Sequence, residues 1–252
     1  MFRGALIGAL SAWMIVSTVA ICEAKTPDEE DVLSKITDAK SAYYYPDMML
    51  KFEMGDINLT LDQYHYLYYG YVFQEEYAPT RSNPNLDKVL QLAASLDMEN
   101  PNAETLREVI NIADGALRVD PFNLKVWNIL AYAYGALDEK IKEREAFDRV
   151  EKILSTINNS GDGLTPKTPK HILAFDHATD MMAAENLTTA KPMIVSRTVE
   201  FVPLVVPRKV EGKKFRGYYF DYGRVYINKP DSVTFKRDRT WQFNNLKPRE
   251  YK

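Results

Sequence analysis

The stretch of sequence that decides the fold is DPFNLKVWNILAYAYGA, residues 120–136. Its first four residues predict the end of one helix and the start of another, because the residue before a proline avoids the helical conformation. Apolar residues then recur at the spacing of one helix face: Val126, Leu130, Ala133 and Tyr134. We therefore expect a turn at 120–123 and a helix that ends near Gly135.

The flanking residues continue this helical pattern. Upstream, a helix is predicted from about Ala103, with apolar residues at 106, 110, 113 and 117. Downstream, a third helix is predicted at 140–157, with three residues facing inward: Phe147, Val150 and Leu154. The charged residues at 140 and 142–145 form its solvated outer face. The sequence thus predicts a layer of packed helices.

This layer resembles the tetratricopeptide repeat, a helix–turn–helix unit of about 34 residues. The resemblance is carried by Trp127-x-x-Leu130-Ala131-x-x-Tyr134 and by the later aromatic residue Phe147. Glu143 and Ser155 depart from the repeat pattern, so the match covers only about 103–155. The resemblance implies that Trp127 is a buried packing residue that faces Phe147 or Ala113.

A second helix signal precedes the layer, in a region rich in tyrosine. Thr60 and Gln63 form a capping box, in which a hydroxyl cap is followed three residues later by Gln. The alternation Tyr64/Tyr66/Tyr68 would also fit a strand, but the cap favours a helix at 60–73. Its predicted inward face carries Leu61, Tyr64, Tyr68 and Tyr71. Shorter helices are expected at 47–54 and 86–96.

The hydrophobic period changes after the turn-rich segment 158–163. Strand patterns follow at 171–175, 191–207, 214–219, 224–228 and 232–243, with one helix at 178–187. The expected fold is therefore α+β: an N-terminal, tetratricopeptide-like helical domain at 25–157, then a small, mainly antiparallel β region with one helix at 158–252.

The chain also resembles a family of exported bacterial proteins of unknown function. The resemblance rests on Tyr45-Pro46-Asp47, Gly55-Asp56, Leu59-Thr60 and the tyrosine-rich run at 64–71. The loop Ser160-Gly161-Asp162-Gly163 matches that family's mid-chain loop, whereas the residues after Phe175 match it poorly. This resemblance implies export and architecture but no particular chemistry.

Residues 1–24 predict a cleavable signal peptide. Arg3 precedes an apolar stretch at 5–21, and Cys22-Glu23-Ala24 places small residues where signal peptidase cleaves. A membrane anchor is the first alternative, although about 17 residues are marginal for crossing a bilayer. A lipoprotein acylated at Cys22 is the second, although Ile21 is unusual before such a site. We expect a location in the periplasm, at the cell surface or outside the cell.

Composition narrows the classes of function. The net charge of −3 is too small to indicate a nucleic-acid partner, and Cys22 is the only cysteine. Export without disulfides favours a bacterial envelope over a eukaryotic secretory pathway. After residue 24 no run is long and apolar enough to span a membrane.

The sequence contains no strong catalytic motif. His177 and Asp180 have a spacing that could hold a metal, but a helix start capped by Asp176 with a solvated His177 is the favoured interpretation. Asp47, Glu53 and Asp56 could supply an acid–base pair, with no pattern that fixes their separation. We expect no metal, no cofactor and no enzymatic activity.

The density of tyrosines is the most unusual feature. Eight lie within thirty residues, more than one buried helix face can hold. Packing of most of these tyrosines in the core is the favoured interpretation, and an exposed surface that binds peptides, proteins or sugars is the alternative. The candidate binding residues are Tyr44, Tyr45, Tyr66, Tyr69 and Tyr71.

Two hypotheses of function follow. In the first, the protein is a non-enzymatic adaptor of the bacterial envelope that binds a protein or peptide. In the second, it binds a small ligand or glycan, with weak hydrolysis as an extension. A cleft that joins the tyrosines to Asp47 or Glu53 would favour the second hypothesis, and a flat face would favour the first.

Overall fold

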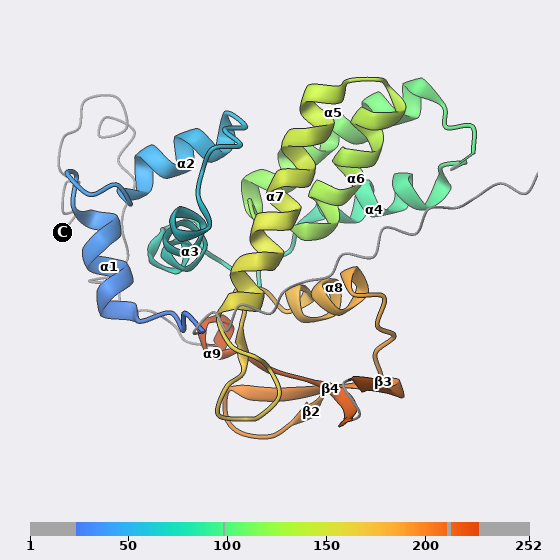
Figure 1. The fold of residues 1–252 in the computed structure, drawn as a ribbon. Helices are drawn as coiled ribbons and strands as arrows, with labels where there is room; N and C mark the ends of the chain where they lie inside the picture. The colour runs from blue at the N-terminus through green and yellow to red at the C-terminus, as the bar shows by residue number, and fades with distance from the viewer. Residues whose placement is uncertain (1–23, 98, 211–212, 227–252) are drawn as a thin grey trace, which may run out of the picture.

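A computed structural model describes residues 24–97, 99–210 and 213–226. Helices occupy the N-terminal part of this described chain, and a small sheet with further short helices follows (Figure 1). The predicted α+β class is therefore confirmed. The predicted signal peptide and the predicted strand at 232–243 lie outside the described residues, except for Ala24.

The first group of helices surrounds the tyrosine-rich segment. It consists of α1 (Glu29–Thr37), α2 (Tyr45–Glu53), α3 (Leu61–Gly70) and the 3-10 turn η1 (Tyr71–Phe73). The capping box of α3 is present: the Thr60 hydroxyl accepts from Gln63 N at 3.1 Å, and Gln63 Oε1 accepts from Thr60 N at 3.0 Å. The predicted single inward face is wrong, because every residue from 64 to 73 is buried and Leu61 is exposed.

The second group forms the predicted helical layer. It consists of α4 (Pro84–Ser95), α5 (Ala103–Val119), α6 (Leu124–Ala136) and α7 (Lys140–Asn159). Asn123 accepts from Val126 N at 3.1 Å and caps α6, so the predicted turn at 120–123 is confirmed. The inward placement of Phe147 is wrong, since its side chain is 49% exposed. Trp127 instead packs edge-on against Phe52 of α2.

The C-terminal elements form a four-stranded sheet in the order β1-β4-β3-β2. They are β1 (Lys170–His171), α8 (Asp176–Ala184), β2 (Met193–Ile194), β3 (Val199–Val210), β4 (Lys213–Asp221) and α9 (Gly223–Tyr226). β1 pairs with β4 in parallel, and the other pairings are antiparallel. Helix α8 lies over one face of the sheet (Figure 1).

The predicted strand at 224–228 is wrong over its described part. Residues 223–226 form α9, in which Val225 N and Tyr226 N both bond to the carbonyl of Tyr222. Tyr222 N is in turn bonded to Thr198 O, which ends the sheet at that point. These local hydrogen bonds satisfy the backbone without a partner strand.

Two hydrophobic cores hold the elements together. The smaller core lies among α4, α5, α6 and α7 and includes Val109, Ala113 and Leu130. The larger core combines α1–α3 with residues of the sheet and α8, such as Met181 and Phe220. It therefore crosses the predicted domain boundary at 157/158. Within the described residues, no helix is long and apolar enough to span a membrane.

Candidate ligand-binding cleft

A cleft of about 530 Å³ lies between α2–η1 on one side and α5 with the start of α6 on the other. Its wall is aromatic and contains Tyr45, Phe52, Tyr71 and Trp127. Three of these rings are buried, whereas Trp127 is half-buried and offers the most ring surface. The size and the aromatic wall are typical of pockets that hold small molecules.

The orientation of Trp127 is held by polar contacts. Its indole Nε1 donates to the carbonyl of Pro121 at 2.8 Å. The guanidinium of Arg149 on α7 lies 4.3 Å from the Trp127 ring centroid and 5.2 Å from that of Phe52. Arg149 Nη2 also donates to the carbonyl of Phe52 at 2.6 Å. These contacts join α2, α6 and α7 behind the cleft wall.

Sequence reasoning missed Arg149. The position of Arg149 in the sequence could have revealed its burial, because it lies on the inward-facing side of α7 between the buried residues Ala146 and Ile153. A charged residue on such a stripe is rarely buried unless it has partners. Burial lowers the pKa of Arg149, yet a guanidinium keeps its charge at neutral pH.

The remaining lining of the cleft is polar and acidic on balance. Three carboxylates and one guanidinium line it: Glu53, Glu76, Asp114 and Arg118. Arg118 and Asp114 pair at 2.8 Å on the exposed face of α5. Gln74 is buried; its Nε2 donates to Gly70 O at 3.1 Å, while its Oε1 has no partner among the described residues. The cleft thus offers mainly hydrogen-bond acceptors.

All five candidate tyrosines are buried in the structure. Tyr45 and Tyr71 line the cleft, whereas Tyr44, Tyr66 and Tyr69 do not. The hydroxyl of Tyr66 donates to Asp31 at 2.8 Å, and that of Tyr69 donates to the His171 carbonyl at 3.0 Å. For these five residues the described structure agrees with core packing and not with the alternative of an exposed tyrosine surface. The rings pack in the core because α1, α2 and the sheet cover α3 on several sides.

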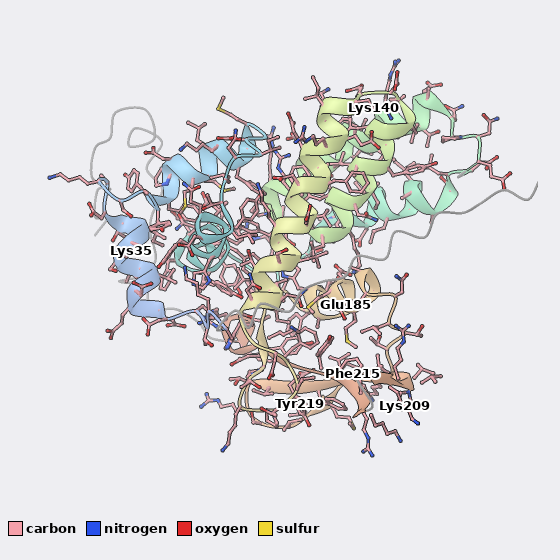
Figure 2. The ribbon with its side chains drawn as sticks, in the orientation of Figure 1. Lys35, Lys140, Glu185, Lys209, Phe215 and Tyr219 are labelled. Carbon is pink, nitrogen blue, oxygen red and sulfur yellow. The ribbon has the colours of Figure 1, made fainter. Side chains whose placement is uncertain are left out.

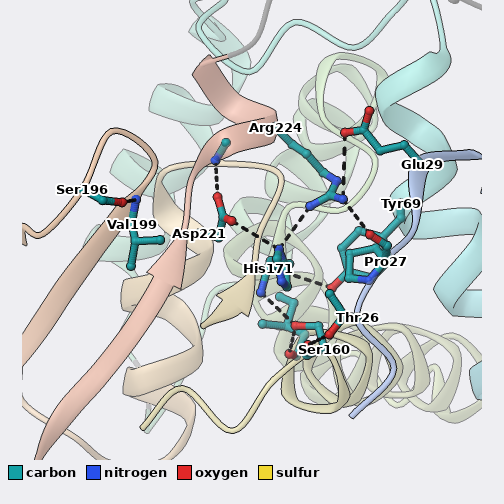
Figure 3. Close-up of polar contacts among 12 residues, drawn as sticks. Thr26, Pro27, Glu29, Tyr69, Ser160, His171, Ser196, Val199, Asp221 and Arg224 are labelled. Atoms are coloured by element: carbon teal, nitrogen blue, oxygen red, sulfur yellow. Dashed lines mark hydrogen bonds and ion pairs between the residues drawn. The ribbon is translucent and has the colours of Figure 1, made fainter. Parts of the chain in front are cut away.

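His171 belongs to a buried polar cluster rather than to the cleft (Figure 3). Arg224 Nη1 lies 3.2 Å from His171 Nδ1, and Asp221 Oδ2 lies 3.7 Å from the same nitrogen. Arg224 Nη2 also donates to the carbonyl of Pro27 at 3.0 Å. Burial is the main cause that lowers the pKa of His171. The cluster joins the segment before α1 to the end of the sheet, which is a structural role.

His177 differs from its sequence-based interpretation. The solvated position expected for it is wrong, because the side chain is 1% exposed and its Nδ1 lies 2.6 Å from Tyr68 Oη. Asp176 does not cap α8 through its side chain but pairs with Lys125 at 2.6 Å. Lys125 also pairs with Asp180 at 3.3 Å. No group of three or more His, Cys, Asp or Glu within the described ranges could hold a metal.

Comparison with known proteins gives one match. A family model described as "Domain of unknown function (DUF4919)" matches residues 30–230. Neither the curated proteins nor the solved structures contain a match to the chain. The predicted resemblance to a family of unknown function is thereby confirmed at that level. Because the match covers most of the sequence, the chain belongs to the DUF4919 family.

Proposed function

We propose that this protein is an exported, non-enzymatic binding protein of the bacterial envelope, and that its cleft holds a neutral sugar. The observation that carries the proposal is the presence of Tyr45, Tyr71 and Glu53 in one cleft. From the sequence, a cleft that joins tyrosines to Glu53 favours the small-ligand hypothesis, whereas a flat surface would favour a protein partner. The export step rests on the signal-peptide pattern of residues 1–24.

The chemistry of the lining supports a sugar. The half-buried ring of Trp127 offers a flat apolar surface for the C–H groups of a pyranose. Carboxylates of Glu53, Glu76 and Asp114 accept hydrogen bonds from hydroxyls, and Arg118 can donate. With three acidic groups against one basic group, the lining disfavours an anionic sugar.

Binding is tested by titrating neutral oligosaccharides while following tryptophan fluorescence in a Trp13→Phe/Trp241→Phe background, in which Trp127 is the single tryptophan. We expect saturable binding, and a loss of at least about tenfold in affinity in Glu53→Gln at unchanged melting temperature, since one charge-assisted hydrogen bond is lost. Glu104→Gln is the matched control, because Glu104 is an exposed carboxylate outside the cleft lining. Absence of binding at millimolar sugar would refute the proposal.

An envelope adaptor is the second candidate function. The helical layer α4–α7 favours it, because stacked helix pairs commonly bind peptides. A photo-reactive residue at position 53, compared with one at position 104, tests this role in intact cells. The adaptor role would be favoured over sugar binding if one partner protein were cross-linked only from position 53. A peptide of that partner should then compete with the cross-linking.

A further inference from the structure

The end of the β3–β4 hairpin contains a large irregularity. Pro203 pairs with Gly217 and Arg208 pairs with Phe215, so residues 204–207 of β3 lie opposite residue 216 alone. Val205 N bonds to the carbonyl of Thr188 instead of to β4. As a result, Val205 and Val206 are 57% and 72% exposed. Two adjacent apolar side chains are therefore left open to solvent at this point of the hairpin.

The same end of the hairpin is strongly basic. Residues 208–216 contain five basic residues and one acidic residue, which gives a charge of +4. The whole chain carries −3, so the remaining residues together carry −7. The basic residues are Arg208, Lys209, Lys213, Lys214 and Arg216. The sequence therefore concentrates positive charge in this hairpin, whereas the rest of the chain is acidic.

The described basic side chains of this region form no ion pairs within the described part of the protein. Lys209 lies directly opposite Lys214 in the strand register, an arrangement that destabilises a sheet. Neither lysine forms an ion pair with a described residue, and the same is true of Arg216. The nearby carboxylate of Glu185 accepts from the Tyr218 hydroxyl at 3.1 Å. An anionic surface would relieve this repulsion.

Aromatic side chains accompany the basic residues. Phe215 and Tyr218 contact each other with ring centroids 4.7 Å apart. Figure 2 shows Lys209 and Phe215 near each other at this end of the sheet, far from Lys35 and Lys140. Both rings are half-buried and pack against the larger core, so the exposed part of this region consists of valines and basic side chains. Such a combination matches segments that insert into the interface of a bilayer.

We infer that the described part of the β3–β4 hairpin that carries Val205, Val206, Lys209, Lys214 and Arg216 docks on the surface of an anionic lipid bilayer. Val205 and Val206 enter the interfacial region, and Lys209, Lys214 and Arg216 pair with headgroup phosphates. A nucleic acid or a soluble anionic sugar would use the charges but would leave the two valines exposed to water. The inference is independent of the cleft, because the lining of the cleft includes none of these residues.

Direct insertion is tested with a polarity-sensitive fluorophore on Val206→Cys in a Cys22→Ser background. We expect a blue shift when vesicles with about one-third phosphatidylglycerol are added, and none with pure phosphatidylcholine. Ile141→Cys is the matched control, because Ile141 is an exposed apolar residue (77%) at the opposite end of the molecule. Equal shifts at both positions, or a shift with both lipids, would overturn the inference.

Charge dependence is tested by sedimentation with the same anionic vesicles. Each lysine that is removed should weaken vesicle binding about fivefold, since one basic residue near an anionic bilayer strengthens binding by about that factor. We expect Lys209→Gln/Lys214→Gln to bind about 25-fold more weakly than wild type, and Lys35→Gln/Lys140→Gln to bind as wild type. Val205→Ser/Val206→Ser should also bind more weakly, while retaining the wild-type melting temperature. Full binding by this valine variant would show an ionic contact only and would contradict insertion.

Discussion

The guanidinium of Arg149 stacks on the indole of Trp127, with 4.3 Å between the guanidinium carbon and the ring centroid. Arg149 also donates to the carbonyl of Phe52, so a single side chain of α7 holds both α6 and α2. Cation–π contacts that exclude water contribute about 2 kcal/mol or more. This pair supports the aromatic wall of the cleft from behind.

Replacement of Trp127 by Ala should destabilise the protein by roughly 3 kcal/mol, because a large packed ring is removed. Combining Trp127→Ala with Arg149→Met in a double-mutant cycle should give a coupling energy of about 1–2 kcal/mol in urea unfolding. A coupling below about 0.3 kcal/mol would show that the stacking contributes little.

Replacement of Thr60 by Ala should destabilise the protein by about 1 kcal/mol, because the N-terminal cap of α3 is lost. Thr37→Ala is the control, since the Thr37 hydroxyl bonds within the last turn of α1 and is exposed. Chemical denaturation of both variants measures the difference. Equal stability of the two variants would mean that the buried surface of α3, rather than its cap, determines its start.

Acid should unfold the protein partly through His65. Burial lowers the pKa of His65 to about 4, so the unfolded chain binds more protons than the folded chain between about pH 4 and 6.5. The stability that His65 contributes is therefore complete above pH 6.5 and is lost as the pH falls through 4. His65→Phe should lose less stability than wild type across this window when urea midpoints are compared. Parallel curves for the two proteins would contradict the assignment.

Glycine is required at position 217. Gly217 has a φ of +146°, and an added Cβ would lie 2.1 Å from the carbonyl oxygen of Val202 on the paired strand. Gly217→Ala should therefore destabilise the protein by about 2 kcal/mol or more and weaken β3–β4 pairing. In contrast, the Cβ of Gly115→Ala would meet only the movable Asn85 side chain within a helix. Circular dichroism during thermal unfolding measures both variants, and a stable Gly217→Ala protein would refute the strain argument.

Local signals in the sequence determined most of the helices. The capping box at Thr60 and the turn at 120–123 act over four residues, so neighbours in the chain suffice to place α3, α5 and α6. The change to strand periodicity after 163 likewise identified the α+β class. The segment at 223–226 was different, because hydrogen bonds to Tyr222 gave a helix where β-type residues predicted a strand.

The cleft was only partly visible in the sequence. Tyr45, Tyr71 and Glu53 could be selected from their residue types, whereas Gln74 and Arg118 carried no signal without their neighbours. Arg149 was interpretable only as one residue of a charged helix until its contact with Trp127 was known.

The sequence by itself determined where most of the helices begin and end, because caps, prolines and periodicity act between residues close in the chain. Only the tertiary structure decided which tyrosines are covered. The hydroxyl of Tyr69 bonds to the carbonyl of His171, and that of Tyr68 bonds to Leu173 N, each more than 100 residues away along the chain. Burial depends on such distant partners, and no local pattern specifies them.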